Sequence, residues 1–167
     1  MTICPIETTY RGHRFRSRLE ARWAVFFDQM DIEYWYEPEG FQFLDGSRYL
    51  PDFYFPQLQM FGEVKPDLPT DQERRKAESL CRATHKNIIL LTGPPAARTY
   101  ESAFWDCEEV TYTDVLLDIH FHNRKFYRLG RLFACTNGQF SDEHMTFDQF
   151  STRFQIAVYA SRAARFE

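Results

Sequence analysis

The segment that most constrains the fold runs from residue 60 to residue 93. It begins with the strand-like run MFGEV, continues through an amphipathic stretch at 69–86, and ends with the apolar run NIILLTG at 87–93. A continuous apolar run after a helix is typical of a buried parallel strand, because a helix is the usual connection between parallel strands. The pattern therefore predicts parallel strands at 60–65 and 88–92, joined by a helix, and an α/β fold.

Two helices are expected on the faces of this sheet. The stretch 17–30 carries an apolar stripe at helical spacing, and Ser17 suits the N-cap position before it. The stretch 69–86 has Thr70 as its N-cap, and Glu73 three residues later completes a capping box. Both patterns predict helices with defined starting points.

Short antiparallel strands are expected between the two helices. One strand ends near Tyr36, and Asp45-Gly46 is a strong hairpin signal between two further runs. The runs DFYF and MFGEV form the next pair of strands, joined by residues 56–59. The resulting order is helix, three or four antiparallel strands, helix and strand, which predicts a mixed sheet flanked by helices.

One core and one accessory region are expected. A chain of 167 residues suits one domain, or one domain with a small appendage. Residues 1–95 contain the elements above and are expected to form the core. In 96–167 the signals are weaker: candidate strands are followed by a helix expected to begin near Thr146, with Gln149 completing a capping box. This region either finishes the core or forms a partner surface.

Composition favours a folded, soluble protein. Aromatic residues make up 17% of the chain, which indicates a packed core. The four cysteines lie far apart with no CxxC pair, which argues against a zinc ribbon or a disulfide framework. No apolar stretch approaches the roughly 20 residues that span a bilayer, and the first residues contain no run of signal-peptide length. We expect a cytoplasmic protein without a membrane partner.

Charged residues inside the second hairpin raise the question of function. A turn centred between Gln57 and Leu58 places Asp52 opposite Glu63, and Lys65 projects from the same face. Two opposed carboxylates repel each other unless a positive charge lies between them. Lys65 offsets part of this repulsion, and a divalent cation offsets more, because carboxylate oxygens are protein ligands of Mg²⁺. Such an ion polarises a phosphoryl oxygen and activates water, which favours phosphodiester hydrolysis.

These residues resemble a known family. PD at 51–52 followed by EVK at 63–65 resembles the PD-(D/E)xK signature of the restriction-endonuclease-like nucleases, and the setting of hairpin, helix and apolar strand is similar. The first motif of that family is usually a glutamate on the preceding helix, and Glu20 fits that place. The run from EVKP to IILLTG looks like the small phage and bacterial single-domain members. The resemblance covers about residues 10–95 and implies an αβββαβ core.

The resemblance also implies roles for five residues. Asp52 and Glu63 would bind a catalytic Mg²⁺ or Mn²⁺, with the backbone carbonyl of Val64 as a further ligand. Glu20 would contact the metal through water or hold a second ion, and Lys65 would position the attacking water. The products would carry 5′-phosphate and 3′-hydroxyl ends.

Structural alternatives stay open for these acids. Ser17-x-x-Glu20 is also a capping box, in which Glu20 bonds back to the Ser17 amide. Glu20 shares a helix face with Trp23 and Phe27 and so borders the buried side, which favours a role in the site. Asp52 alone is explained by a strand edge, and the remaining charges of the hairpin by a solvent-facing strand.

Five further side chains are candidates for contacts with nucleic acid. Between residues 11 and 22 the chain has five arginines and a histidine against one acid, although its net charge is −4. Such a patch is a footprint for phosphate binding and makes binding salt-dependent, while a solvated helix start explains the patch alone more simply. Two weaker candidates lie on the second helix. The five are Arg16, Arg18, Arg22, Gln72 and Arg75.

We expect a divalent-metal-dependent endonuclease, a phosphodiester hydrolase with Mg²⁺ or Mn²⁺ as cofactor and DNA as substrate. A catalytically inactive nuclease-like module that binds nucleic acid or a protein partner is the alternative from another class. The intact set of two acids and a lysine argues against it. RNA cleavage is a second alternative, for which His13 would be an extra ligand. A homodimer and a larger protein complex both stay open as assemblies.

Overall fold

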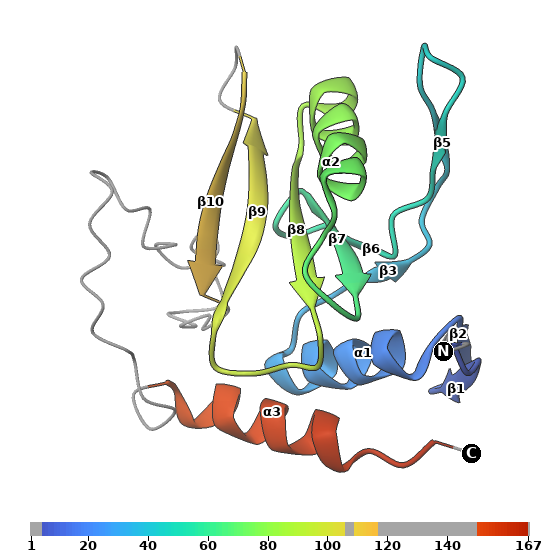
Figure 1. The fold of residues 1–167 in the computed structure, drawn as a ribbon. Helices are drawn as coiled ribbons and strands as arrows, with labels where there is room; N and C mark the ends of the chain where they lie inside the picture. Colours follow the sequence, from blue (N-terminus) through green and yellow to red (C-terminus); the bar gives the residue numbers. More distant parts are fainter. Residues whose placement is uncertain (1–4, 106–108, 117–149, 167) are drawn as a thin grey trace.

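Figure 1 shows the computed structural model, which describes residues 5–105, 109–116 and 150–166. The helices in these ranges are α1 (Arg18–Met30), α2 (Asp71–Thr84) and α3 (Thr152–Ala163). The strands of the main sheet are β3 (Trp35–Tyr36), β6 (Phe53–Phe55), β7 (Met60–Lys65), β8 (Asn87–Thr92), β9 (Thr99–Trp105) and β10 (Val110–Leu116). The six strands lie in the order β10-β9-β8-β7-β6-β3, with both parallel and antiparallel neighbours. The expected α/β class with a mixed sheet is confirmed.

The expected strand–helix–strand unit is present. β7 and β8 run parallel, from Met60 beside Asn87 to Lys65 beside Thr92, and α2 connects them. The hydroxyl of Thr70 accepts a hydrogen bond from the Glu73 amide, and the Glu73 carboxylate accepts one from the Thr70 amide. The predicted capping box is therefore confirmed, and it orients the first turn of α2 next to the end of β7.

The hairpin β6–β7 has the expected register. Phe53 pairs with Gly62 and Tyr54 pairs with Phe61, as a turn centred after Gln57 requires. Extending this register by one residue places Asp52, which directly precedes β6, beside Glu63. The hairpin thus brings together two acids that lie eleven positions apart in the chain.

The two faces of the sheet are covered by different helices. α1 and α3 run side by side along one face, and α2 packs on the other (Figure 1). The cluster on the first face includes Trp23, Phe26, Phe27, Phe53, Phe55, Val64 and Phe154. The cluster on the second face includes Tyr54, Phe61, Ala77, Leu80, Cys81, Ile88 and Leu90. Residues along β7 alternate between these faces, so Glu63 and Lys65 lie on the side of α2.

Residues after 95 add to the same sheet and to the helix layer. β9 pairs antiparallel with β8, and β10 pairs antiparallel with β9. The expected start of the last helix near Thr146, and Gln149 of its expected capping box, lie outside the described residues. Within them α3 begins at Thr152, because the hydroxyl of Ser151 caps the amide of Phe154. None of the three helices described has the length and apolar character that a membrane span needs.

Two small hairpins stand apart from the main sheet. β1 (Thr8–Tyr10) and β2 (His13–Phe15) form a hairpin that the sequence pattern did not predict, and its turn contains Gly12 at a positive φ of 80°. β4 (Phe41–Gln42) and β5 (Arg48–Tyr49) form the hairpin expected around Asp45-Gly46. This second hairpin is a separate two-stranded sheet that projects beyond β3 and β6 (Figure 1).

Candidate active site

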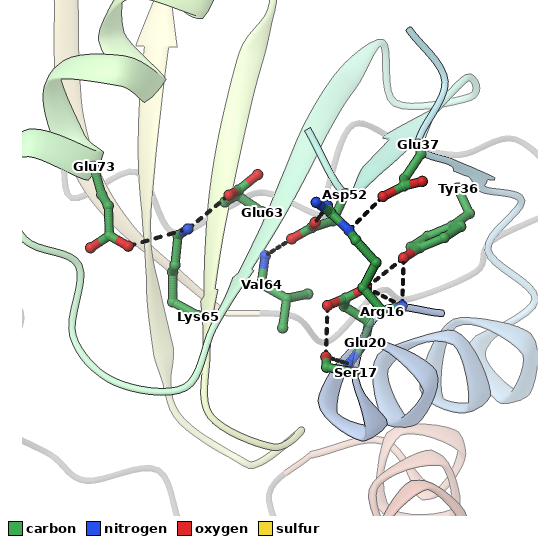
Figure 2. Close-up of polar contacts among 10 residues, drawn as sticks. All are labelled: Arg16, Ser17, Glu20, Tyr36, Glu37, Asp52, Glu63, Val64, Lys65 and Glu73. Atoms are coloured by element: carbon green, nitrogen blue, oxygen red, sulfur yellow. Dashed lines mark hydrogen bonds and ion pairs between the residues drawn. The ribbon is translucent and has the colours of Figure 1, made fainter. Parts of the chain in front are cut away.

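Two acids are buried side by side at the ends of β6 and β7 (Figure 2). Asp52 is 4% exposed and Glu63 is 6% exposed. One Asp52 oxygen, Oδ2, accepts a hydrogen bond of 2.7 Å from the amide of Val64. Burial, and next the negative charge of Glu63, raise the pKa of Asp52 to about 8. The repulsion that the hairpin pattern predicts between the two carboxylates is therefore a property of the folded chain.

Lys65 lies beside the second acid and links it to α2. Its Nζ atom is 2.8 Å from Glu63 Oε1 and 3.2 Å from Glu73 Oε1. Burial lowers the pKa of Lys65, but the charges of Glu63 and Glu73 outweigh burial, and the pKa of Lys65 is raised. The side chain is thus a charged ammonium near neutral pH, suited to attract and orient an anion rather than to accept a proton.

Glu20 enters the site from α1 and is 8% exposed. Its Oε1 accepts a hydrogen bond of 2.6 Å from the Ser17 hydroxyl, and its Oε2 accepts bonds from the Tyr36 hydroxyl (2.6 Å) and the Arg16 amide (3.2 Å). Ser17 caps the helix as expected, because its hydroxyl accepts from the Glu20 amide. The carboxylate bonds the Ser17 hydroxyl in place of the Ser17 amide that the capping alternative required.

Arg16 forms ion pairs with two acids of the site, Asp52 and Glu37. Its Nη2 lies 2.7 Å from Asp52 Oδ1, and its Nε lies 2.5 Å from Glu37 Oε1. Glu37 directly follows β3, and its amide donates to the Asp52 carbonyl at 2.8 Å. The polar cluster therefore combines residues from α1, β3, β6, β7 and α2 (Figure 2). Its ten members, which we call the charged cluster, are Arg16, Ser17, Glu20, Tyr36, Glu37, Asp52, Glu63, Val64, Lys65 and Glu73.

The other predicted nucleic-acid contacts lie outside the charged cluster. The guanidinium of Arg22 donates to the carbonyl oxygens of Ser161 and Arg162, at 2.7 and 2.6 Å, and so joins α1 to the end of α3. The three remaining candidates lie at the surface, and no hydrogen bond or ion pair joins them to the charged cluster within the described ranges. They are Arg18, Gln72 and Arg75.

Sequence reasoning missed four residues that shape the site. Tyr36 and Glu37 reach it because β3 pairs with β6, and Glu73 reaches it through the first turn of α2. Tyr49 comes from the projecting hairpin β4–β5, where burial and the charge of Glu63 raise its pKa well above the usual value. The capping signal at Glu73 was visible in the sequence, but its second contact with Lys65 depends on tertiary structure.

The end of β7 is tied to α1 through the turn after β8. The indole of Trp23 donates to the carbonyl of Gly93 at 2.9 Å, and the amide of Gly93 donates to the carbonyl of Lys65 at 2.7 Å. Gly93 has a positive φ of 61°, and a Cβ atom there would lie 2.7 Å from the Arg98 guanidinium. The positive φ favours glycine at this turn, whereas the Arg98 side chain could shift to admit a Cβ atom.

The acids fit a divalent ion in donor type and charge. Glu63 Oε2 is buried and lies outside the ion pair that Lys65 forms with Oε1, and the Tyr49 hydroxyl interacts with the same carboxylate. In the described part of the chain, however, no three side chains of the His, Cys, Asp or Glu type converge as a ready metal group. The reason is visible in the contacts: Arg16 engages Asp52, Lys65 engages Glu63, and Glu20 is bonded to its own helix start and to β3.

The sequence matches no protein-family model, and no curated protein matches it. Functional inference therefore depends on the residues and contacts described above.

Proposed function

We propose that the protein is a divalent-metal-dependent nuclease of the PD-(D/E)xK type that hydrolyses phosphodiester bonds in DNA. The observation that carries the proposal is the pair of buried acids, Asp52 and Glu63, with the Lys65 ammonium 2.8 Å from Glu63. Burying two acids together is unfavourable for a metal-free fold, because each charge loses water and repels the other. A role in binding a cation accounts for this cost.

The arrangement of elements supports the same proposal. When only the strands of the main sheet are counted, and the separate hairpin β4–β5 is left out, α1, β3, β6, β7, α2 and β8 follow the αβββαβ order of a restriction-endonuclease-like core. Asp52 directly precedes β6, and Glu63 and Lys65 lie on β7, so all three are at the end of the hairpin where the motif of that family would require them. The strands β9 and β10 and the helix α3 add to this core.

Each residue of the charged cluster has a role in this proposal. Asp52 and Glu63 would hold Mg²⁺ or Mn²⁺ through carboxylate oxygens, with the Val64 carbonyl as a further ligand, and Glu20 would act through water or at a second ion. When bound, the ion supplies Lewis-acid polarisation of the phosphoryl group and activation of water. The Lys65 ammonium orients the attacking water and stabilises the negative charge that grows on the phosphate.

The direct test is a cleavage assay on a panel of substrates. The full-length protein is incubated with plasmid, single-stranded DNA or RNA, each with Mg²⁺, Mn²⁺ or EDTA. We expect DNA cleavage with either ion and none with EDTA. Activity that survives EDTA would rule out the metal mechanism. Cleavage of RNA alone would change the substrate class, and binding of DNA without cleavage would identify an inactive module.

Variants assign the activity to the proposed acids. Glu63→Gln keeps the shape of the side chain but removes its charge, and we expect cleavage to fall at least about 100-fold, as when one electrostatic partner of a transition state is lost. Glu78→Gln is the matched control, because Glu78 pairs with Arg82 at the surface of α2, away from the charged cluster. Equal loss in both variants would count against the assignment.

A further inference from the structure

Arg16 occupies the place at which a cation would meet Asp52. Its guanidinium contacts Asp52 Oδ1 at 2.7 Å and Glu37 Oε1 at 2.5 Å, so it bridges acids from two elements. The Asp52 side chain is 6% exposed, whereas the Arg16 side chain is 52% exposed. The arginine thus covers a buried acid from the solvent side and has open space into which it can move.

The distribution of charges makes Arg16 the main counter-ion of Asp52. The other cation of the charged cluster, Lys65, lies between Glu63 and Glu73 and forms its ion pairs with them. Among the described residues, Arg16 alone forms an ion pair with Asp52. Removal of one partner from a buried pair leaves an uncompensated charge, which is strongly unfavourable. Asp52 therefore always needs a positive charge next to it when it is ionised.

We propose that Arg16 is a displaceable counter-ion: its guanidinium holds Asp52 Oδ1 until a divalent cation binds, and then leaves that oxygen. This inference rests on the proposed ion site at Asp52 and Glu63. A divalent ion and the guanidinium compete for Asp52 Oδ1, because both bind that oxygen and two positive groups repel each other at contact distance.

Glu37 gives the displaced side chain a resting partner. Its carboxylate already contacts Arg16 Nε, so the guanidinium can release Asp52 and keep one ion pair. Exchange of partners at one end of a long side chain requires rotamer changes and no movement of the backbone. The Arg16 amide stays bonded to Glu20 Oε2 and to the Tyr36 hydroxyl throughout, which keeps the start of α1 in place.

Competition between the arginine and the ion has a measurable consequence. Part of the binding free energy of the ion is used to break the Arg16–Asp52 pair, which weakens the observed affinity. Arg16→Gln removes the competing charge and keeps a polar side chain of similar length. We expect this variant to bind Mn²⁺ at least about 5-fold more tightly, the lower end of typical coupling between two ligands.

The test measures Mn²⁺ binding to the full-length protein without nucleic acid, by the electron paramagnetic resonance signal of free Mn²⁺. Wild type is compared with Arg16→Gln and with Arg11→Gln, a matched control whose arginine pairs with Asp28 outside the charged cluster. Tighter binding only in Arg16→Gln supports the inference. Equal or weaker binding in Arg16→Gln overturns it, as does a failure of all three proteins to bind Mn²⁺.

A second variant at the same position keeps the test decisive where Arg16→Gln fails to fold. Arg16→Lys keeps one positive charge but cannot form the two-pronged bridge between Asp52 and Glu37, so we expect an affinity between those of wild type and Arg16→Gln. Cleavage is measured separately. Tighter Mn²⁺ binding by Arg16→Gln without any cleavage would refute the proposed nuclease activity but not the role of Arg16 as a displaceable counter-ion. Cleavage by wild type with unchanged Mn²⁺ affinity in both variants would refute only the role of Arg16.

Discussion

The hairpin β6–β7 has two faces that differ along their length. Toward α1 the face is apolar from end to end, with Phe53, Phe55 and Val64 all buried. Toward α2 the face begins with the buried ring of Phe61 and ends with the acids and Lys65. The same two strands therefore form a core on one side and a charged site on the other.

The difference follows from what covers each face. α1 and α3 together close the first face, where aromatic rings pack at centroid distances of 5.2 Å between Phe27 and Phe53 and 5.5 Å between Phe26 and Phe154. On the second face, α2 supplies Leu80 to the apolar end and only the carboxylate of Glu73 to the charged end. The apolar face holds the strands in place, which allows the other face to carry charges that stabilise little by themselves.

The largest effect is expected from removing an aromatic ring of the apolar face. Phe53→Ala should lower the free energy of unfolding by about 3–5 kcal/mol, because a fully buried phenylalanine leaves both lost burial and a cavity. Urea denaturation followed by circular dichroism measures this change. Phe43→Ala, in the half-buried hairpin β4–β5, is the control and should cost much less. Similar losses of unfolding free energy in the two variants would contradict the conclusion that the face toward α1 holds the strands in place.

The next effect concerns the charged end. Lys65→Ala should reduce cleavage at least about 100-fold, because the proposed function assigns to this ammonium the stabilisation of charge on the phosphate. The variant should still unfold cooperatively, since the apolar face is untouched. Lys76→Ala on α2 is the control. A cleavage rate that stays at the wild-type level would remove Lys65 from its assigned role.

A pH series tests the electrostatic cost of the charged end. The pKa of Asp52 is raised from 3.8 to about 8, so the folded chain holds a proton there that the unfolded chain releases above pH 4. This group therefore destabilises the metal-free protein progressively as the pH rises from about 4 to about 8. Asp52→Asn should remove that decline and raise the melting temperature at pH 8. A melting temperature below that of wild type at pH 8 would mean that the pair with Arg16 outweighs the repulsion.

The smallest effect is expected at the start of α2. Thr70→Ala should cost about 1 kcal/mol of unfolding free energy, because the Glu73 amide loses its cap. It should also lower cleavage slightly, since Glu73 then positions Lys65 less firmly. Ser79→Ala, further along the same helix, is the control for both measurements. A loss of cleavage as large as that of Lys65→Ala would show that the helix cap and Lys65 are more strongly coupled than the contacts indicate.

Local patterns were enough to predict the framework of the site. Ser17 and Thr70 begin their helices as expected, because a capping hydroxyl needs only the next three residues. The register that places Asp52 beside Glu63 follows from a short turn and the two-residue period of strands. These features depend on neighbours in the chain, which a sequence displays directly.

The partners of the charged residues could not be predicted in the same way. Arg16 was expected to face nucleic acid, and its contact with Asp52 joins residues 36 positions apart, one just before α1 and the other just before β6. Arg22 was expected at the same surface, and its contact with Ser161 joins residues 139 positions apart. The hairpin β1–β2 also escaped prediction, because strands of three residues show too little alternation to be recognised.

The hydrogen-bonded path from Trp23 through Gly93 to Lys65 makes the indole of α1 an internal reporter of the backbone at Lys65. Trp23 is fully buried, so its emission maximum lies at shorter wavelength than that of the exposed Trp35. If ligand binding at the acids shifts the backbone of Lys65, the shift reaches the Trp23 ring through two hydrogen bonds. Occupancy of the site can then be followed by the fluorescence of the unlabelled protein.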